Sequence, residues 1–181
     1  MHDMTAKNLR SAFGGESQAH MRYLIWGEKA EKDGFPNVAR LFRAVASAEQ
    51  IHATAHFKAL KNVKGDFDVT SGAGFGFGTT SENLEAAKNG ELFEVNEMYP
   101  AYINVAEMQE EKEAINSMKF AIAAEKVHAK LFEEAKKAVD SGKDIEADKI
   151  YVCPFCGFVE IGGPVDKCPI CGAPNSKFKI F

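Results

Sequence analysis

Glutamate and histidine recur at core-facing positions of four helix-like stretches in this sequence. The pattern Glu-x-x-His begins at Glu49 and again at Glu125, and each copy places a carboxylate and an imidazole on one helical face. Carboxylate and imidazole together are ligands that suit iron and related metals. With the other glutamates of these seams included, the candidate metal ligands are Glu16, Glu49, His52, Glu91, Glu94, Glu125 and His128.

The five carboxylates of this set would be unstable in a protein core without counter-charge. Burying an ionised carboxylate costs several kcal/mol even after relaxation, and five facing one another would unfold a small bundle. Two divalent cations supply four positive charges against the five negative ones, which leaves a nearly neutral cluster. The alternative, glutamates on solvated helix faces, conflicts with their positions in the apolar seams. The seams therefore predict a binuclear metal site.

The candidate ligands also repeat along the chain. Glu49 follows Glu16 by 33 positions (49 − 16), and Glu125 follows Glu91 by 34 (125 − 91). Each half is therefore expected to form a helical hairpin whose second helix carries Glu-x-x-His. This is the known arrangement of di-iron carboxylate bundles, in which facing helices direct these side chains inward.

Two of the ligands exceed a plain two-fold site. Glu94 adds a second inward carboxylate to its helix, and His52 is an imidazole beyond the ligands of such a site. Because carboxylates suit ferric iron and imidazole suits ferrous iron, we hypothesise that Glu94 and His52 alternate on one metal as its oxidation state changes. Tyr23 and Tyr99 are placed to hydrogen-bond ligands, with plain core aromatics as the alternative. The candidate catalytic residues are Glu94, which could transfer protons when released, His52, Tyr23 and Tyr99.

Two Cys-x-x-Cys-Gly motifs occupy the last part of the chain and predict a second metal site. The candidate ligands are Cys153, Cys156, Cys168 and Cys171. Such paired motifs favour a tetrahedral four-thiolate site, which zinc and a single iron both fit. Zinc has no redox chemistry, so a redox-capable site in the same chain favours iron here.

Four helices in two hairpins must position the carboxylate ligands. The first region, to about residue 64, breaks at Gly34 and Pro36, which can end one helix and begin the next. A glycine-rich stretch at about 64–80 then predicts an extended crossover that returns the chain along the bundle. The predicted domains are a four-helix bundle at 1–145 and a metal-binding tail at 146–181.

The second hairpin has less obvious boundaries. Thr79 and Glu82 can form a capping box that starts the third helix, and Pro100 should kink that helix. The turn to the fourth helix is placed at about 109–112, although no Gly or Pro marks it. Without a turn, one continuous helix would hold the ligands of this hairpin roughly 50 Å apart.

Composition limits the remaining possibilities. The 181 residues carry 22 Lys and Arg against 26 Asp and Glu, and the net charge of −4 argues against a nucleic-acid binder. No stretch approaches the roughly 18 apolar residues of a membrane span, and the N-terminus lacks the pattern of a signal peptide. The expected location is the cytoplasm, with no membrane partner.

These motifs resemble the rubrerythrins over nearly the whole chain. The matching sets are Glu16 with Tyr23, Glu49 with His52, Glu91 with Glu94 and Tyr99, Glu125 with His128, and the two Cys-x-x-Cys pairs. The resemblance implies a mainly α fold: a ferritin-like four-helix bundle followed by a small C-terminal rubredoxin-like domain with a four-cysteine metal site. The implied cofactors are two non-haem irons, oxo-bridged when oxidised, and one iron in the four-cysteine site.

The resemblance also implies a peroxidase of oxidative-stress defence that reduces hydrogen peroxide to water. Electrons would pass through the cysteine-bound iron from a rubredoxin or an NAD(P)H-dependent reductase, because no nucleotide-binding glycine loop is present in this chain. The family commonly forms dimers in which the rubredoxin-like domain of one chain approaches the di-iron site of another. A homodimer is therefore expected, and a flexible linker near Gly142 would permit this arrangement.

Two rival functions use the same motifs. A ferritin-type ferroxidase would handle iron in the bundle and keep a structural four-cysteine site, whereas a zinc-ribbon interaction module would need no electron transfer. The cysteine tail argues against the first, and the seams give no support to the second. Two departures from the family pattern are the glycine-free turn at about 109–112 and the short stretch of 11 residues between Cys156 and Cys168.

Overall fold

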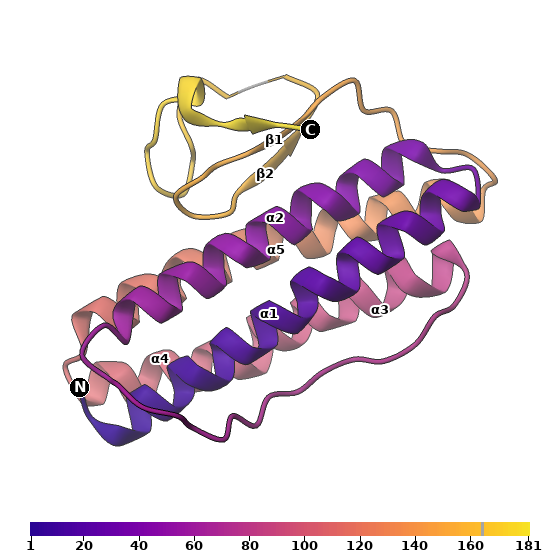
Figure 1. Ribbon diagram of the computed structural model, residues 1–181. Coiled ribbons are helices and arrows are strands. Elements are labelled where there is room, and N and C mark those ends of the chain that lie inside the picture. Colours follow the sequence, from indigo (N-terminus) through magenta and orange to yellow (C-terminus); the bar gives the residue numbers. More distant parts are fainter. Residues whose placement is uncertain (164) are drawn as a thin grey trace.

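Two helical hairpins joined by a long crossover form a four-helix bundle in the computed structural model, which describes residues 1–163 and 165–181 (Figure 1). The helical elements are α1 (Asp3–Lys32), α2 (Pro36–Ala59), α3 (Thr80–Phe93), the π-helical turn η1 (Glu94–Met98), α4 (Tyr99–Met108) and α5 (Lys112–Asp140). α1 packs mainly on α2, while α3 and α4 pack on α5. The predicted mainly α, four-helix architecture is confirmed, with α3, η1 and α4 together forming the third long helix.

The turns within the two hairpins use different residues to reverse the chain. Gly34, with φ +91°, follows α1, and Pro36 opens α2, as predicted. The second turn lies at 109–111, and Glu110 there adopts φ +57°. This left-handed conformation costs roughly 1–2 kcal/mol for a residue with a Cβ. The packed helices on either side therefore hold Glu110 in a conformation that glycine usually adopts.

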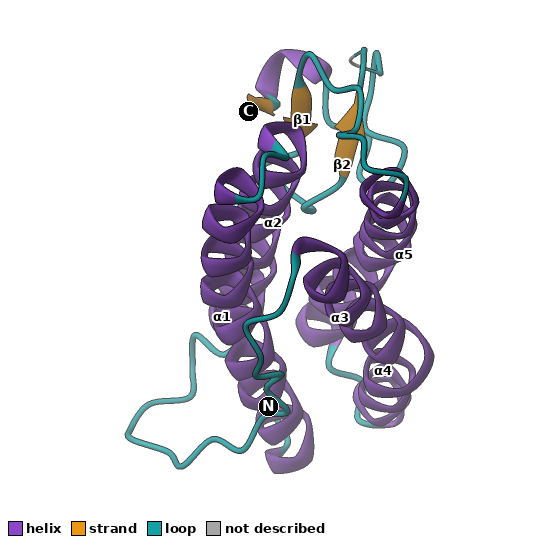
Figure 2. Cartoon of the chain, turned by 90° about the vertical axis from the view of Figure 1, so that its right-hand side faces the viewer, coloured by secondary structure: helices purple, strands orange, loops and turns teal. Residues whose placement is uncertain are grey.

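The glycine-rich crossover returns the chain along α1, as the long loop in Figures 1 and 2 shows. Ser11 Oγ donates a hydrogen bond to the carbonyl of Thr70 at 2.9 Å. Farther along α1, Trp26 Nε1 donates to the carbonyl of Gly76 at 3.0 Å. These bonds attach the extended segment to the helix at both ends, so the crossover covers the outer side of α1.

The third long helix is irregular at the level of the ligands. Thr79 and Glu82 form the predicted capping box at its start. Pro100 has no backbone donor for the carbonyl of Asn96, and the helix widens into η1 around that carbonyl. The distortion therefore precedes Pro100, and Glu94 is its first residue.

Two apolar layers enclose a charged centre in the bundle. One layer includes Trp26 and Phe42, and the other includes Leu9 and Met118. Glu16 lies between the two layers along α1 and is fully buried. The layers stabilise the bundle by removing apolar surface from water, and they also keep water from the ends of the charged centre. Among the described residues, no helix has the length and apolarity needed to cross a membrane.

The C-terminal part, called here the four-Cys unit (residues 150–181), is a small antiparallel sheet. Its elements are β1 (Ile150–Val152), β2 (Val159–Ile161), the 3₁₀ turn η2 (Asn175–Lys177) and β3 (Lys179–Ile180), with strand order β2-β1-β3. The sheet lies across α2 and α5 (Figure 1). Val152 and Val159 belong to the same hydrophobic core as Phe42. The unit therefore packs as part of the body of the protein, while the domain boundary near residue 145 stays a prediction.

Candidate metal centres

Six of the seven predicted carboxylate-site ligands meet at the centre of the bundle. They form two groups, Glu16, Glu49, His52 and Glu125, and Glu49, Glu91, Glu125 and His128; within each group the ligand atoms lie within 4.8 Å of one another. Glu49 and Glu125 belong to both groups, so each of these carboxylates can bridge two ions. α1 and α3 contribute one Glu each, whereas α2 and α5 contribute Glu-x-x-His.

The unpartnered oxygen atoms of this cluster fit a pair of cations. One carboxylate oxygen each of Glu16, Glu49, Glu91 and Glu125 is buried without a well-oriented hydrogen bond from the described residues. Burial raises the pKa of Glu16 and Glu91 well above the ordinary value, and the charge of Glu125 raises both further. Bound cations would satisfy these oxygens and stabilise the ionised carboxylates. The donor set therefore fits a di-iron carboxylate site.

The two ligand histidines face the glutamates with Nδ1 and donate a hydrogen bond from Nε2. Nδ1 of His52 lies 2.6 Å from Oε1 of Glu125, and Nδ1 of His128 lies 2.7 Å from Oε2 of the same residue. On the opposite side, Nε2 of His52 donates to the carbonyl of Cys156, and Nε2 of His128 donates to that of Gly157, each at 3.0 Å. The Nε2–H tautomer leaves Nδ1 free to bind a metal.

The two tyrosines each contact a carboxylate of the cluster that lies on another helix. Tyr23, seven positions after Glu16 (23 − 16), donates its hydroxyl hydrogen to Glu91. Tyr99, eight positions after Glu91 (99 − 91), donates to Glu16. Each tyrosine thus ties α1 to the third long helix, and both rings are buried. The predicted contacts between tyrosines and candidate ligands are present.

Glu94 stands outside both ligand groups. It begins the π-helical turn and is half-buried, unlike the six clustered side chains. A cavity of about 390 Å³ lies beside it, lined also by Arg22 and Gly90. His52 therefore belongs to the ligand cluster, whereas Glu94 lies at the wall of a cavity.

His56 is a buried residue at the site that the sequence did not single out as a ligand or catalytic group. Its Nε2 lies 2.9 Å from the hydroxyl oxygen of Tyr99, and its Nδ1 lies 2.7 Å from Oγ of Ser117. Because Tyr99 donates to Glu16, its oxygen accepts from His56, and Nδ1 accepts from Ser117. Burial lowers the pKa of His56 to about 3, which keeps the ring neutral. Its position one helical turn after His52 was the available signal.

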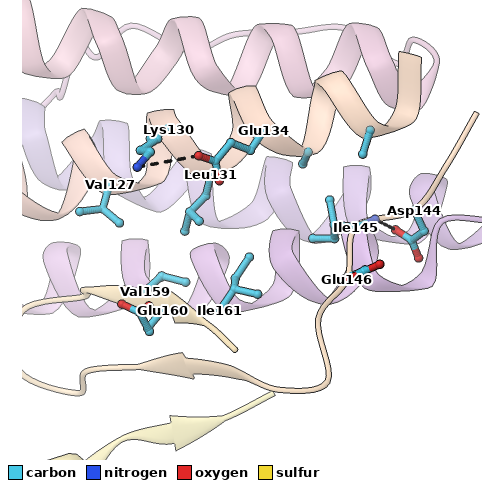
Figure 3. Close-up of a pocket in the computed structure, with 12 residues that line it drawn as sticks. Val127, Lys130, Leu131, Glu134, Asp144, Ile145, Glu146, Val159, Glu160 and Ile161 are labelled. Atoms are coloured by element: carbon cyan, nitrogen blue, oxygen red, sulfur yellow. Dashed lines mark hydrogen bonds and ion pairs between the residues drawn. The ribbon is translucent and has the colours of Figure 1, made fainter. Parts of the chain in front are cut away.

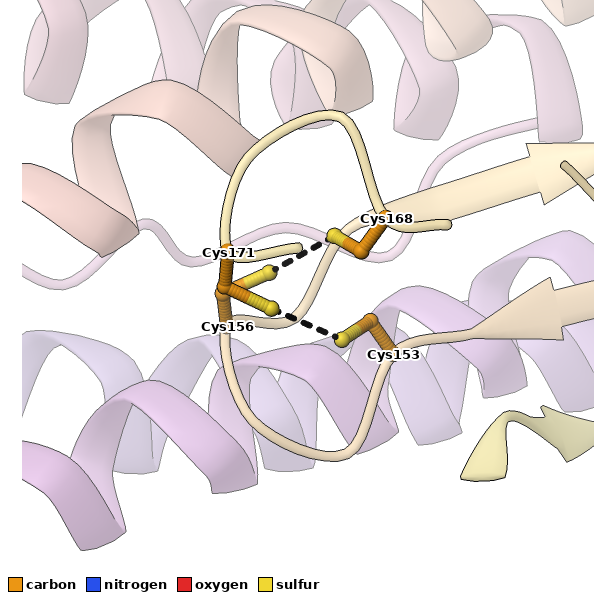
Figure 4. A group of neighbouring side chains, drawn as sticks. All are labelled: Cys153, Cys156, Cys168 and Cys171. Atoms are coloured by element: carbon orange, nitrogen blue, oxygen red, sulfur yellow. Dashed lines mark hydrogen bonds between the residues drawn. The ribbon is translucent and has the colours of Figure 1, made fainter. Parts of the chain in front are cut away.

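The four cysteines converge on one point at the ends of two similar turns (Figure 4). Sγ of Cys153 lies 3.5 Å from that of Cys171, and Sγ of Cys156 lies 3.4 Å from that of Cys168. A hydrogen bond from the Cys156 thiol, with nearby backbone amides, lowers the pKa of Cys153 to about 5. A group of four sulfurs with amides directed at them fits a tetrahedral metal site.

Comparison with known proteins places both halves of the chain in one family. The family model "Rubrerythrin" matches residues 7–136, and "Rubrerythrin, rubredoxin-like domain" matches residues 151–179. Rubrerythrin-2 of Clostridium acetobutylicum is 51% identical over 178 residues, which is 98% of this chain and 97% of that protein. Nigerythrin of Nitratidesulfovibrio vulgaris is 33% identical over 177 residues, which is 98% of this chain and 86% of that protein.

Solved structures share the same architecture. Nigerythrin in its fully reduced, all-ferrous state superposes with a TM-score of 0.89 at 31% identity, covering 100% of this chain and 88% of that chain. Chlorobium tepidum ferritin has a TM-score of 0.64 at 18% identity over 77% of this chain and 86% of its own, and it shares the fold alone. The two ligand clusters match the iron cofactors of rubrerythrins. The chain therefore belongs to the rubrerythrin family of di-iron oxidoreductases.

Proposed function

We propose that this chain is a non-haem di-iron peroxidase that reduces hydrogen peroxide to water in oxidative-stress defence. The reaction consumes one peroxide, two electrons and two protons and releases two waters. Iron held by the carboxylates and histidines would supply the electrons that break the O–O bond, and iron held by the four thiolates would carry electrons singly. Membership of the rubrerythrin family and the two ligand clusters support the proposal.

Direct contact between the two clusters is the observation that carries the proposal. His52 and His128 face the glutamates with Nδ1 and donate from Nε2 to two successive carbonyls of the four-Cys unit. Each imidazole therefore connects the two sites. Its Nδ1 faces the glutamates, and the hydrogen bond from its Nε2 reaches the backbone of the four-Cys unit. A ferroxidase with a structural four-cysteine site needs no such connection, so the contact favours the peroxidase over that alternative.

Within the site, the polar neighbours of the ligands have distinct roles in this proposal. Tyr23 and Tyr99 hold Glu91 and Glu16 in one orientation through donated hydrogen bonds. Glu94 lies at the cavity wall, and we assign it the exchange with His52 as a ligand and the transfer of a proton to the departing oxygen.

The remaining partners in this proposal are carried over from the family. An electron-donor protein, either a rubredoxin or an NAD(P)H-dependent reductase, would reduce the four-thiolate site. The chain would act in the cytoplasm as a homodimer.

Anaerobic single-turnover kinetics test the proposal. The iron-loaded protein is reduced, mixed with one equivalent of hydrogen peroxide, and followed by the visible absorbance of the ferric four-thiolate iron. We expect rapid return of the colour with peroxide and much slower return with oxygen. Faster reaction with oxygen than with peroxide would support the ferroxidase, and a protein that never develops colour would indicate zinc in the four-Cys unit.

A further inference from the structure

The Tyr99 hydroxyl, which donates a hydrogen bond to the ligand Glu16, is itself held by two further side chains. Nε2 of His56 lies 2.9 Å from the Tyr99 oxygen, and Nδ1 of His56 lies 2.7 Å from Oγ of Ser117. Oε1 of Glu16 lies 3.8 Å from the same Nε2, which is too far for a hydrogen bond. The hydrogen bonds therefore connect His56 to Glu16 through Tyr99.

The donors and acceptors of this hydrogen-bond chain (Ser117, His56, Tyr99 and Glu16) fit one direction. The hydroxyl hydrogen of Tyr99 is directed at Glu16, so the Tyr99 oxygen accepts from His56. A neutral imidazole that donates from Nε2 accepts at Nδ1, where Ser117 can donate. In the opposite direction Tyr99 would donate to His56, and Glu16 would lose its hydrogen bond. All four side chains are buried, so water does not compete for these bonds.

The other half of the repeat has an apolar pair at the equivalent positions. His56 and Phe132 each lie seven positions after the glutamate of Glu-x-x-His on their own helix (56 − 49 and 132 − 125). Ser117 and Leu41 each lie eight positions before that glutamate (125 − 117 and 49 − 41). Phe132 and Leu41 are both fully buried. A polar pair in one half of the bundle therefore corresponds to an apolar pair in the other.

The two tyrosines consequently differ in what their oxygen atoms accept. Tyr23 also donates to a ligand glutamate, but no side chain among the described residues donates a hydrogen bond to its oxygen. The Phe132 ring packs edge-on against Tyr23, with 5.3 Å between the ring centroids. The His56 ring lies at a similar distance, 5.8 Å, from the ring of Tyr99. Each tyrosine thus has a ring beside it, and one of the two rings donates a hydrogen bond.

A hydrogen bond received by the Tyr99 oxygen strengthens the bond that the same hydroxyl donates, because successive hydrogen bonds polarise one another in a protein interior. A stronger bond to Glu16 draws negative charge away from this carboxylate, which then stabilises a bound ferric ion less. A ferrous ion has a lower charge and loses less of this stabilisation. Glu16 belongs to the ligand group of His52 and not to that of His128. The effect therefore acts mainly on one of the two metal positions.

We propose that His56 is a positioning residue that makes the two metal positions unequal, so that the ion beside Glu16 is reduced before the ion beside Glu91. In this step one ferric ion gains one electron, and the four-thiolate iron loses it. The inference goes beyond the proposed function, because it rests on the di-iron cofactor of the family and does not require peroxide to be the oxidant.

The four-thiolate iron provides an internal reference for this proposal. In Figure 3, Val127 and Leu131 of α5 face Val159 and Ile161 of the four-Cys unit across a cavity of about 560 Å³. Val127 lies ten positions after Ser117 (127 − 117), which is about 15 Å along the helix. Changes in the hydrogen-bond chain should therefore leave the reduction potential of the four-thiolate iron at its wild-type value.

Anaerobic redox titration of the iron-loaded protein tests the proposal. The half-reduced carboxylate site has an unpaired electron, so electron paramagnetic resonance measures how much of this form is present at each potential. Its amount gives the equilibrium constant for forming two half-reduced sites from one oxidised and one fully reduced site. His56→Leu should lower this constant about tenfold, which corresponds to about 59 mV between the two one-electron steps.

Matched variants separate the hydrogen bond from packing. Phe132→Leu makes the equivalent change in the other half, where no hydrogen bond is lost, and should keep the wild-type constant. His56→Gln can still donate to Tyr99 and accept from Ser117, so it should behave like wild type. Ser117→Ala frees the choice of tautomer at His56 and should have an intermediate effect. Equal constants in H56L and F132L would overturn the proposal.

A variant that copies the apolar pair of the other half is available if H56L does not bind iron. His56→Phe combined with Ser117→Leu removes the hydrogen bond to Tyr99 without leaving Ser117 unpaired, and it should show the same tenfold decrease. A wild-type constant in this double variant would also overturn the proposal.

The tautomer of His56 gives a readout that does not involve iron. In zinc-loaded protein, nitrogen NMR should show the Nε2–H tautomer in wild type and a mixture of both tautomers in Ser117→Ala. A wild-type His56 that carries its hydrogen on Nδ1 would contradict the direction of the hydrogen-bond chain and with it the proposal.

Failure of this inference and failure of the proposed function give different results. If peroxide does not oxidise the reduced wild-type protein, the peroxidase is wrong, and the redox titration still tests His56. If wild type reacts with peroxide but H56L and F132L have the same constant, the peroxidase stands and only the role of His56 is wrong.

Discussion

The carboxylate centre and the four-Cys unit hold their ligands by opposite means. The carboxylate ligands span 112 positions, from Glu16 to His128 (128 − 16), and come from four separate helices. The cysteines span 18 positions, from Cys153 to Cys171 (171 − 153), and come from two short turns. The first site exists only when the whole bundle has folded, whereas backbone turns bring the thiolates together locally. Changes to the bundle should therefore affect one site and spare the other.

The same contrast applies to the polar groups around each metal site. The glutamates retain buried oxygens that helix packing does not satisfy, so their neutralisation depends on bound cations. The sulfurs are approached by backbone amides of their own turns, among them those of Phe155 and Cys156 near Cys153. Bound metal should accordingly increase the free energy of unfolding of the bundle, because it neutralises these buried carboxylates.

The largest expected effect comes from removing a carboxylate that both ligand groups share. Glu125→Ala should release the iron of the carboxylate site and lower peroxide turnover by about a hundredfold or more, because no other side chain bridges the two groups from α5. The colour of the four-thiolate iron should remain. Iron content and visible absorbance measure the two sites separately, and Glu133→Ala, an exposed change on the same helix, is the control. Retention of all iron in E125A would contradict the assignment.

Metal-free and metal-loaded protein should respond to pH in opposite directions. The raised pKa values of Glu16 and Glu91 mean that the folded metal-free chain keeps protons that the unfolded chain has lost. This contribution to stability is complete below the ordinary carboxyl pKa of about 4.5 and is lost as pH rises through the raised values. In the loaded protein, protons compete with metal, so stability should rise with pH. Denaturant unfolding of both forms between about pH 5 and 8 measures how the free energy of unfolding changes with pH. The same direction of change in the two forms would refute the prediction.

A smaller effect is expected at His56, which lies behind Tyr99. His56→Leu leaves the Tyr99 oxygen and the Ser117 hydroxyl without their partner, and should reduce the free energy of unfolding by about 1–3 kcal/mol. Ser117→Ala removes only the outer hydrogen bond and should cost about 1 kcal/mol. Unfolding of the metal-loaded variants by denaturant provides the comparison. Equal stability of H56L and wild type would mean that this hydrogen-bond chain contributes nothing.

The smallest effect separates attachment of the four-Cys unit from ordinary helix capping. Asp144→Ala and Thr79→Ala each remove a side chain that accepts from a helix N-terminus, and each should cost about 1 kcal/mol. D144A should speed proteolytic cleavage of the segment at 141–149, which joins α5 to the four-Cys unit, and T79A should not, because Asp144 contacts α2 from that segment and Thr79 lies outside it. Similar cleavage of both variants would show that the segment is held in another way.

The elements of the bundle and most of the ligand set were predictable because their signals are local. Helical periodicity places Glu49 with His52, and Glu125 with His128, on one face whatever the neighbouring helices do. The glycine-rich crossover and the capping box at Thr79 follow from backbone preferences of a few residues. Even the unmarked turn at 109–111 followed from distance, since a continuous helix could not bring its two ends to one site.

Contacts between helices were not predictable to the same degree. Spacing placed Tyr23 and Tyr99 near ligands, but it did not identify the carboxylate that each hydroxyl contacts, because each ring crosses to a neighbouring helix. The position of Glu94 outside the cluster depends on a π-helical turn that a helical wheel does not represent. His56 looked like any seam residue until Tyr99 and Ser117 were brought beside it.

Residue types and their spacing along the chain were therefore enough to identify two metal sites, their ligand chemistry and the four helices, because each depends on periodicity or on short turns. The contact of Gly157 with His52 had no sequence signal, since 105 positions separate them (157 − 52) and a glycine after Cys-x-x-Cys is expected for its backbone conformation alone. Packing of β1 and β2 on α2 brings these two residues together. Whether a metal site stands alone or is connected to another is thus a property of long-range packing.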